Sequence, residues 1–385
     1  LGMENPTVQD IFHSFYLKYL DRYTPSAEQA KVSHCIMNCK TGAYGANVSV
    51  CEDCGHLQIH YNSCRNRCCP MCQALPTEKW MDAQREDVLE APYFHVVFTV
   101  PQELNPLIYC NQKLLYDALY HSVSSTINEL AEDEKYLGAK VGYICILHTW
   151  GSEMNFHPHI HVILLGGGLT AKNQWRDKGE EFFFPVKVLS KLFRGKYLDE
   201  LKTLWKNKKL HFHGSSEKYR NHYAFKELIN ICYEKDWIPH CKKAFNGAQS
   251  VIHYLGKYIH RIAISNRRII RMDENTVTYY VKDYREAGKW KALTIPGVEF
   301  IRRFLMHVPP KRFVRIRHYG LLCTRSKTKH LTLCRNLLGC RQYLSRLKNM
   351  ETAQILETLY GIKVSVCKCC GGHLGKPQQR IPLRI

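Results

Sequence analysis

The segment FHPHIHVILLGGG, from Phe156 to Gly168, is the feature that most limits what this chain can fold into. His157, His159 and His161 stand at every second position, and alternate side chains of a β-strand share one face. The apolar run after them predicts that the strand is buried. Three imidazoles on a buried strand are costly without a partner. The segment therefore predicts a metal site, with plain surface or core histidines as the alternative.

Two imidazoles on one strand leave coordination positions free for a third protein ligand and for a substrate oxygen. This arrangement is typical of catalytic metal sites rather than closed structural ones. An H-x-H strand also occurs in metal-dependent hydrolases of small molecules, which need further ligands on several later parallel strands. The sequence lacks the regular alternation of strands and helices that such a barrel requires, so this alternative is not favoured.

A second candidate group is the segment QSVIHYLGKYIHR, from Gln249 to Arg261. Tyr254 and Tyr258 are four residues apart, which places them on one face of a helix, with Lys257 beside them. Taken alone, this spacing favours an amphipathic helix with packed tyrosines. Beside a metal site, a tyrosine hydroxyl can attack a phosphodiester while a cation steadies the leaving oxygen. We therefore predict Tyr254 and Tyr258 as nucleophiles and Lys257 as a catalytic cation.

The charge of the chain indicates a polyanionic partner. Lys plus Arg number 55 and Asp plus Glu 34, a formal net charge of +21, and from Ile301 to Met350 every acidic or basic residue is Lys or Arg. Aromatic residues interleave with these cations, which suits nucleic acid better than lipid. The residues that we predict to contact DNA are all basic: Arg65, Arg67, Arg267, Arg268, Lys311, Arg312, Arg315 and Arg317.

No apolar run is long enough for a membrane span, and the first residues do not resemble a secretion signal. We therefore expect a cytoplasmic protein without a membrane partner. Its oligomeric state does not follow from the sequence.

Eight of the 18 cysteines lie in closely spaced pairs between Cys35 and Cys72, which is more typical of Zn²⁺ ligands than of disulfides in such a protein. A first structural zinc is predicted at the two C-x-x-C pairs Cys51, Cys54, Cys69 and Cys72. A second is predicted at the pairs Cys35, Cys39, Cys64 and Cys68. Candidates for a third are Cys367 and Cys370, with Cys323, Cys334 or Cys340 as partners.

The pattern of apolar residues predicts helices near 7–40, 76–91, 105–135, 185–206, 217–235 and 296–307, and strands at 93–101, 141–150 and the histidine segment. Residues 267–284 predict a hairpin that turns at 273–275. Scattered strands of this kind favour an α+β fold with a largely antiparallel sheet. We expect a helical and zinc-binding DNA-binding domain over 1–90, a nuclease domain over 91–305 and a basic DNA-binding region over 306–385.

Several of these segments together resemble one known family. The segments YNSCRNRCCPMC, YFHVVFTVP, HPHIHVILLGGG, YLGKYIHRIAISNRRI and IRHYGLL are similar to the motifs of the rolling-circle transposases of bacterial insertion sequences. These belong to the two-tyrosine HUH endonuclease superfamily, where U is a hydrophobic residue. The similarity extends over most of the chain.

The resemblance implies an HUH endonuclease core whose sheet has the histidine strand at its centre and the tyrosine helix across its metal face. It implies Mg²⁺ or Mn²⁺ at His159 and His161, with Gln249 favoured over His157 as the third ligand. It also implies 5′-phosphotyrosine intermediates formed by Tyr254 and Tyr258.

The expected substrates are single-stranded DNA and hairpins at element ends. A host helicase would be needed for unwinding, because the chain lacks a G-x-x-x-x-G-K loop. The alternatives are a plasmid-type rolling-circle replication initiator and a zinc-dependent DNA-binding regulator without nuclease activity.

Overall fold

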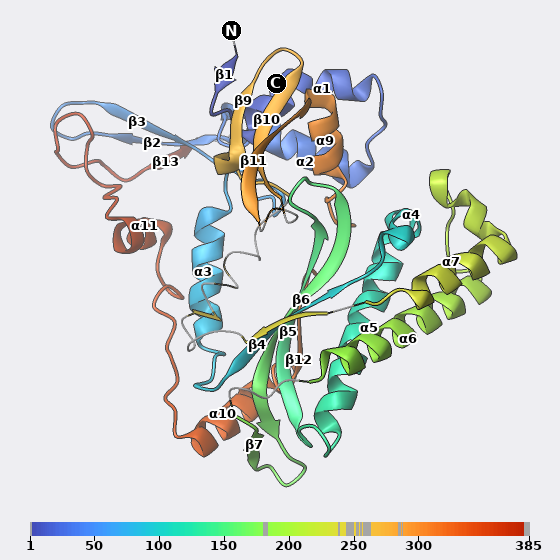
Figure 1. Cartoon of the computed structure of the whole chain (residues 1–385). Helices are drawn as coiled ribbons and strands as arrows, with labels where there is room; N and C mark the ends of the chain where they lie inside the picture. Colours follow the sequence, from blue (N-terminus) through green and yellow to red (C-terminus); the bar gives the residue numbers. More distant parts are fainter. Residues whose placement is uncertain are drawn as a thin grey trace.

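The structure, a computed structural model, describes residues 2–179, 184–237, 239–243, 250–251, 254, 256, 263–283, 286 and 288–380 (Figure 1). The helices are α1 (Val8–Leu20), α2 (Ala27–Met37), α3 (Ala74–Arg85), α4 (Asn105–Cys110), α5 (Gln112–Glu132), α6 (Val186–Lys206), α7 (His222–Glu234), α9 (Gly297–Leu305), α10 (Lys327–Leu338) and α11 (Thr352–Tyr360). The strands are β1 (Met3–Glu4), β2 (Ala46–Val50), β3 (Leu57–Tyr61), β4 (Tyr93–Thr99), β5 (Lys140–Trp150), β6 (Phe156–Leu169), β7 (Trp175–Asp177), β8 (His240–Lys243), β9 (Ile269–Met272), β10 (Thr276–Asp283), β11 (Lys289–Pro296), β12 (Ile316–Gly320) and β13 (Gln378–Arg380). Within the described residues, no helix combines the length and the apolar composition that a membrane crossing requires.

The largest sheet has the strand order β12-β5-β6-β4-β8, and β7 pairs with the far end of β6. Each of these pairings is antiparallel. The predicted α+β fold with a largely antiparallel sheet is therefore confirmed. The histidine strand β6 lies at the centre, between β5 and β4, as the resemblance implied.

The two faces of this sheet carry different side chains because neighbouring residues of a strand point to opposite sides. On one face Phe98, Cys145 and Ile160 belong to a buried apolar core with residues of α5, α6 and α7. Figure 1 shows these three helices on one side of the sheet and α3 on the other. The second face, toward α3, carries the histidines of β4, β5 and β6.

The three glycines that end the histidine segment allow close packing around β6. A Cβ atom on Gly166 would lie 2.7 Å from the Phe94 ring, and one on Gly168 would lie 2.3 Å from the carbonyl oxygen of Lys140. Cβ atoms essentially never approach so closely. The glycines therefore let β6 continue at full length between its neighbouring strands.

A second sheet has the order β1-β9-β10-β11 and packs against α1, α2 and α9. Phe12 and Phe15 of α1 share a buried core with Phe300 and Phe304 of α9. The predicted hairpin, with its turn between β9 and β10, is confirmed. This core contains residues of the N-terminal helices and residues from 269–305. It therefore includes residues from both sides of the domain boundary that we expected at residue 90. The proposed domain limits stay a prediction.

The C-terminal region returns to earlier parts of the chain at three places. Strand β12 forms the edge of the large sheet beside β5. The carboxylate of Asp82, on α3, accepts hydrogen bonds from Tyr343 Oη (2.7 Å), Ser345 Oγ (2.6 Å) and the Leu347 N–H (2.8 Å). Strand β13 adds to the hairpin β2–β3 in a three-stranded sheet.

Candidate functional site: a histidine cluster beside a tyrosine

Three histidines meet on the α3-facing side of the large sheet. His148 of β5 is paired directly opposite His159 of β6, and His161 lies two residues further along β6. The ligating nitrogens of the three side chains lie within 4.8 Å of one another, and all three side chains are buried. Antiparallel register thus assembles the cluster from two adjacent strands.

The contacts of the cluster bring the Nε2 atoms of the two β6 histidines together. His159 Nδ1 donates to the carbonyl oxygen of His157 at 2.7 Å, which leaves Nε2 with a lone pair. His161 Nδ1 lies 3.0 Å from His95 Nε2. The two Nε2 atoms, 3.1 Å apart, therefore point toward the same place.

Burial keeps these imidazoles neutral, as metal ligation requires. It lowers the pKa of His159 to about 4, and that of His161 falls well below its ordinary value because of burial and the neighbouring His148. A buried group of neutral imidazoles whose ring nitrogens converge is suited to a divalent transition-metal ion.

The structure brings His148, and not His157, together with His159 and His161. The ring of His157 lies next to that of His159, with 5.1 Å between centroids, but it does not join the cluster, and His148 takes that place. Trp150 pairs with Phe156 and His148 with His159, so β6 has one extra residue in this interval. This bulge removes the simple alternation on which the prediction for His157 rested. Gln249, the other candidate, lies outside the described residues.

Tyr254 reaches the cluster through His95. Its hydroxyl oxygen lies 2.6 Å from His95 Nε2 and 3.2 Å from His95 Nδ1. Tyr254 also packs on the apolar cluster that surrounds the histidines on this face of the sheet. A Cβ atom on Gly256 would lie 2.0 Å from Met81 Sδ of α3, so a larger residue at this position would require the Met81 side chain to move. Tyr258 and Lys257 lie outside the described residues.

Two residues of this site, His148 and His95, were missed from the sequence. Both occur in segments predicted as strands, VGYICILHTW and YFHVVFTVP. Each is a lone histidine in an apolar run, a pattern that more often indicates a packed core residue. The register of β4, β5 and β6 was needed to place them beside His161.

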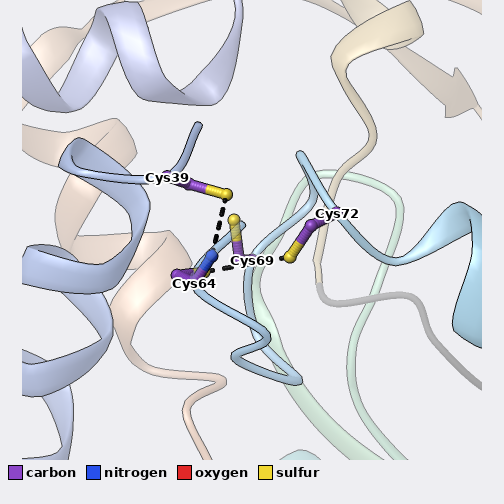
Figure 2. A group of neighbouring side chains, drawn as sticks. All are labelled: Cys39, Cys64, Cys69 and Cys72. Carbon is purple, nitrogen blue, oxygen red and sulfur yellow. Dashed lines mark hydrogen bonds between the residues drawn. The ribbon is translucent and has the colours of Figure 1, made fainter. Parts of the chain in front are cut away.

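One cysteine cluster lies where α2, the 64–72 segment and α3 meet, and Figure 2 shows its four side chains, Cys39, Cys64, Cys69 and Cys72. The sulfurs of Cys64 and Cys72 are 3.8 Å apart. Four sulfurs each about 2.3 Å from a central zinc would lie roughly 3.8 Å apart, so this spacing fits a tetrahedral ion.

The thiols of this cluster influence one another strongly. Hydrogen bonds with Cys64 and Cys69 hold the pKa of Cys72 well below its ordinary value, and those with Cys64 and Cys72 raise the pKa of Cys69. The opposite directions of these two shifts reflect the hydrogen bonds among the thiols. A bound cation would stabilise all four as thiolates.

A second group consists of Cys51, Cys54, Cys367 and Cys370. The predicted set that combined Cys51 and Cys54 with Cys69 and Cys72 is therefore wrong. The physical reason is the hairpin: Cys51 and Cys54 lie in the connection between β2 and β3, whereas the 64–72 segment folds back against α2. Each of the two C-x-x-C pairs therefore belongs to a different group of four cysteines: Cys51 and Cys54 meet Cys367 and Cys370, whereas Cys69 and Cys72 meet Cys39 and Cys64.

The predicted second set is also corrected, because only Cys39 and Cys64 of its four members meet. Cys35 accepts a hydrogen bond from the Tyr44 hydroxyl, and Cys68 is buried in the α1–α9 core. Among the suggested partners of Cys367 and Cys370, Cys334 packs in the apolar cluster on the same face of the sheet as the histidines. Cys323 and Cys340 also lie outside the four-cysteine group.

The predicted DNA contacts fall into two classes. Four arginines have internal partners: Arg67 donates to the Phe313 carbonyl, Arg268 to those of Tyr280 and Ser152, Arg315 stacks over Trp150, and Arg317 pairs with Asp117. The other four are exposed: Arg65, Arg267, Lys311 and Arg312. DNA contact stays a prediction for all eight.

The fold and the site define a protein in which a buried histidine cluster suited to a metal ion lies beside a tyrosine, with a cysteine-rich module attached. Residues 142–330 match the family described as "Putative transposase", and residues 11–100 match the "Transposase zinc-binding domain" family. The "Putative transposase y4qJ" of Sinorhizobium fredii is 39% identical over 341 residues, which cover 88% of this chain and 86% of that protein. The chain belongs to this transposase family.

A second relative is the transposase for insertion sequence element IS801 of Pseudomonas savastanoi pv. phaseolicola. It is 28% identical over 299 residues, which cover 75% of this chain and 69% of the relative. Among solved structures, the conjugative relaxase TrwC in complex with oriT DNA aligns with 69% of this chain and 99% of its own, at 12% identity and a TM-score of 0.25. A score this low carries no argument about the fold.

Proposed function

We propose that the protein nicks and rejoins single-stranded DNA through a 5′-phosphotyrosine at Tyr254, during rolling-circle transposition. The observation that supports this most directly is the position of the Tyr254 hydroxyl. It lies 2.6 Å from His95 Nε2, and the same nitrogen lies 3.0 Å from Nδ1 of His161, a member of the metal cluster. A nucleophile and a metal site therefore share one face of the sheet.

We assign the catalytic metal to His148, His159 and His161. When bound, a divalent ion such as Mn²⁺ or Mg²⁺ would polarise the scissile phosphate and stabilise its developing charge. Three imidazoles suit Mn²⁺ better than Mg²⁺, which prefers oxygen ligands and keeps much of its hydration shell.

In the reaction that we propose, Tyr254 Oη forms a bond to phosphorus in line with the bond to the leaving 3′ oxygen. The products are a 5′-phosphotyrosine and a free 3′ hydroxyl; the phenol proton passes to solvent and the 3′ oxygen takes up a proton. His95 positions the attacking hydroxyl. Tyr258 would make the second cut and Lys257 would steady the leaving oxygen, as the sequence predicts.

We propose that Zn²⁺ at Cys39, Cys64, Cys69 and Cys72 shapes a DNA-binding tip that includes Arg65. Arg67, two residues further on, donates to the carbonyls of Phe313 (2.6 Å) and Pro310 (3.3 Å). These carbonyls flank the exposed pair Lys311 and Arg312, so cations from both segments lie close together and suit DNA phosphates.

The scissile phosphate must reach the face of the sheet that carries Tyr254. Single-stranded or hairpin DNA allows this approach more readily than a plain duplex. Separation of strands would be supplied by a host helicase, and such a substrate places the protein on the bacterial nucleoid. These partners are proposals that follow from the chemistry of the site.

The test is a cleavage assay with labelled single-stranded DNA from the ends of the element, Mn²⁺ and a denaturing gel. A covalent protein–DNA band is expected, and it should vanish in the Tyr254→Phe, Tyr258→Phe double variant and in His159→Ala. Tyr223→Phe, at a tyrosine 80% exposed on α7, is the matched control and should keep the band. Covalent adducts in the double variant would contradict the mechanism, and tight binding without any band would favour a regulator without nuclease activity.

A further inference from the structure

The two C-x-x-C pairs Cys51 with Cys54 and Cys367 with Cys370 lie in two turns of matching structure, far apart in the sequence. In the first, the Cys51 N–H donates to the His56 carbonyl (2.9 Å) and the Gly55 N–H to the Cys51 carbonyl (3.0 Å). In the second, the Cys367 N–H donates to the Gly372 carbonyl (2.8 Å) and the Gly371 N–H to the Cys367 carbonyl (3.0 Å). The two turns thus repeat the same hydrogen bonds at equivalent positions.

Each turn also uses a glycine in the same backbone conformation. Gly55 and Gly371 directly follow the second cysteine of their pairs, with φ of 69° and 78°. This left-handed region is costly for side-chain-bearing residues. In the second turn, backbone N–H groups point at the sulfurs: Cys369 N lies 3.3 Å from Cys367 Sγ, and Gly372 N lies 3.4 Å from Cys370 Sγ. Such donors stabilise thiolate rather than thiol.

The sulfur positions fit one tetrahedral ion. Sγ of Cys51 lies 3.5 Å from that of Cys370, and Sγ of Cys54 lies 3.8 Å from that of Cys367. These separations are close to the roughly 3.8 Å of a zinc tetrathiolate. They are far from the about 2.05 Å of a disulfide.

The module around these cysteines has very little apolar core. Its buried apolar cluster consists of Cys51, Cys367 and Leu374. Leu57, Ile59 and Tyr61 of β3 are all at least half exposed, with exposed fractions of 57%, 50% and 52%. A unit with so little buried apolar surface requires a metal or another crosslink to remain folded.

We propose that Cys51, Cys54, Cys367 and Cys370 bind a second Zn²⁺ that joins residues 361–380 to the N-terminal module. Backbone contacts already bring the two segments together: Glu52 N–H donates to the His373 carbonyl (3.0 Å), Gly375 N–H to the Val50 carbonyl (2.9 Å), and β13 pairs with β2. The ion takes four thiolates and releases their protons to solvent. This site does not depend on the tyrosine chemistry proposed above.

The test counts zinc ions on the full chain by native mass spectrometry, after dialysis under reducing conditions. Cys51→Ser with Cys54→Ser should lose one zinc, and Cys367→Ser with Cys370→Ser should lose one. The variant with all four substitutions should also lose only one, because both pairs hold the same ion. The matched control is Cys369→Ser, which removes an exposed thiol between the two ligands and should lose none.

A second readout follows the peptide chain itself. Loss of the ion should raise the rate of proteolysis within 361–380 about tenfold or more, while the large sheet stays resistant. The proposal is overturned if the fourfold variant loses two zinc ions or if either double variant loses none. It is also overturned if alkylation and mass measurement show two disulfides in the protein kept in reducing buffer. These readouts do not use DNA cleavage, so they stand apart from a failure of the nuclease proposal.

Discussion

The hydroxyl of Tyr254 lies 2.6 Å from Nε2 of His95, on the face of the large sheet that carries the cluster of His148, His159 and His161. The rings are 4.6 Å apart between centroids, so the contact includes packing as well as a hydrogen bond. His95 is itself buried on β4, one strand away from His161. The position of the hydroxyl is therefore set by a strand of the sheet as well as by its own helix.

His95→Phe keeps an aromatic ring and removes both nitrogens. We expect the rate of adduct formation at saturating Mn²⁺ to fall roughly 10- to 100-fold, because the hydroxyl loses its partner. The Mn²⁺ concentration for half-maximal rate should also rise, since His161 loses a hydrogen bond. His95→Gln should recover part of the rate. Single-turnover gels measure both quantities, and a wild-type rate in His95→Phe would exclude a positioning role.

His148→Ala and His157→Ala form a matched pair at the cluster. His148→Ala should weaken Mn²⁺ binding by about 100-fold or more, because a ligand is lost. His157→Ala should leave it nearly unchanged, because His159 uses the main-chain carbonyl of residue 157. Calorimetric titration of each variant with Mn²⁺ and with Mg²⁺ decides the question, and Mn²⁺ should bind more tightly. Equal losses in both variants would argue against the ligand set proposed above.

Lys311→Ala with Arg312→Ala should weaken binding to single-stranded DNA equally for unrelated sequences. Each lost phosphate contact should reduce the slope of log affinity against log salt by about 0.7. Fluorescence anisotropy over a salt series provides both numbers. Lys172→Ala, at an exposed lysine between β6 and β7, is the control for loss of charge alone and should change the slope less.

Asp82→Ala removes the acceptor of three hydrogen bonds on α3. Burial alone would raise the pKa of Asp82, but hydrogen bonds led by that of Ser345 hold it below its ordinary value. Loss of this buried carboxylate should destabilise the contact with residues 343–347 by about 3 kcal/mol. Urea unfolding and proteolysis within 339–350 measure the effect. Unchanged resistance to proteolysis would mean that other contacts hold this segment.

The stability of the metal-free protein should fall in acid before the carboxylates titrate. Burial lowers the pKa of His159 and of His307 to about 4, whereas an unfolded histidine titrates near about 6.5. Protons therefore bind the unfolded chain first, and the free energy of unfolding should decrease as the pH falls from about 6.5 to about 4. Urea titrations across this range test the trend. His307→Gln should show a shallower decrease, and a flat profile for the parent protein would contradict the assignment.

The strands that carry the site could be predicted from the sequence, but the register in which these strands pair could not. The apolar run after the alternating histidines correctly predicted that β6 is buried, and the resemblance correctly implied that it is central. Placing His148 beside His159 and His161 required knowledge that β5 lies next to β6, with His148 opposite His159. A one-residue bulge displaced His157, and Pro158, which has no backbone N–H to donate, is the local signal that marks it. Pairing between strands depends on contacts distant in sequence, which local patterns do not encode.

The same limit applies to the cysteines. C-x-x-C spacing correctly marked Cys51 with Cys54 and Cys367 with Cys370 as pairs, because a turn is a local property. Which pairs meet is decided by folding of the whole chain: Cys39 follows α2, and residues 367–370 return from the far end of the sequence. Proximity in sequence favoured Cys69 and Cys72 as partners of the first pair, and this choice was wrong.

The addition of β13 to β2 has a consequence for the order in which the protein is completed during synthesis. The hairpin β2–β3 leaves the ribosome early, but its neighbouring strand is translated more than 300 residues later, at Gln378–Arg380. A truncated product, even one that carries the whole histidine cluster, would expose an unpaired edge of β2 and two unsatisfied thiols. Such fragments should be recognised readily by cellular proteases, so that chains that include β13 should persist longer than fragments that lack it.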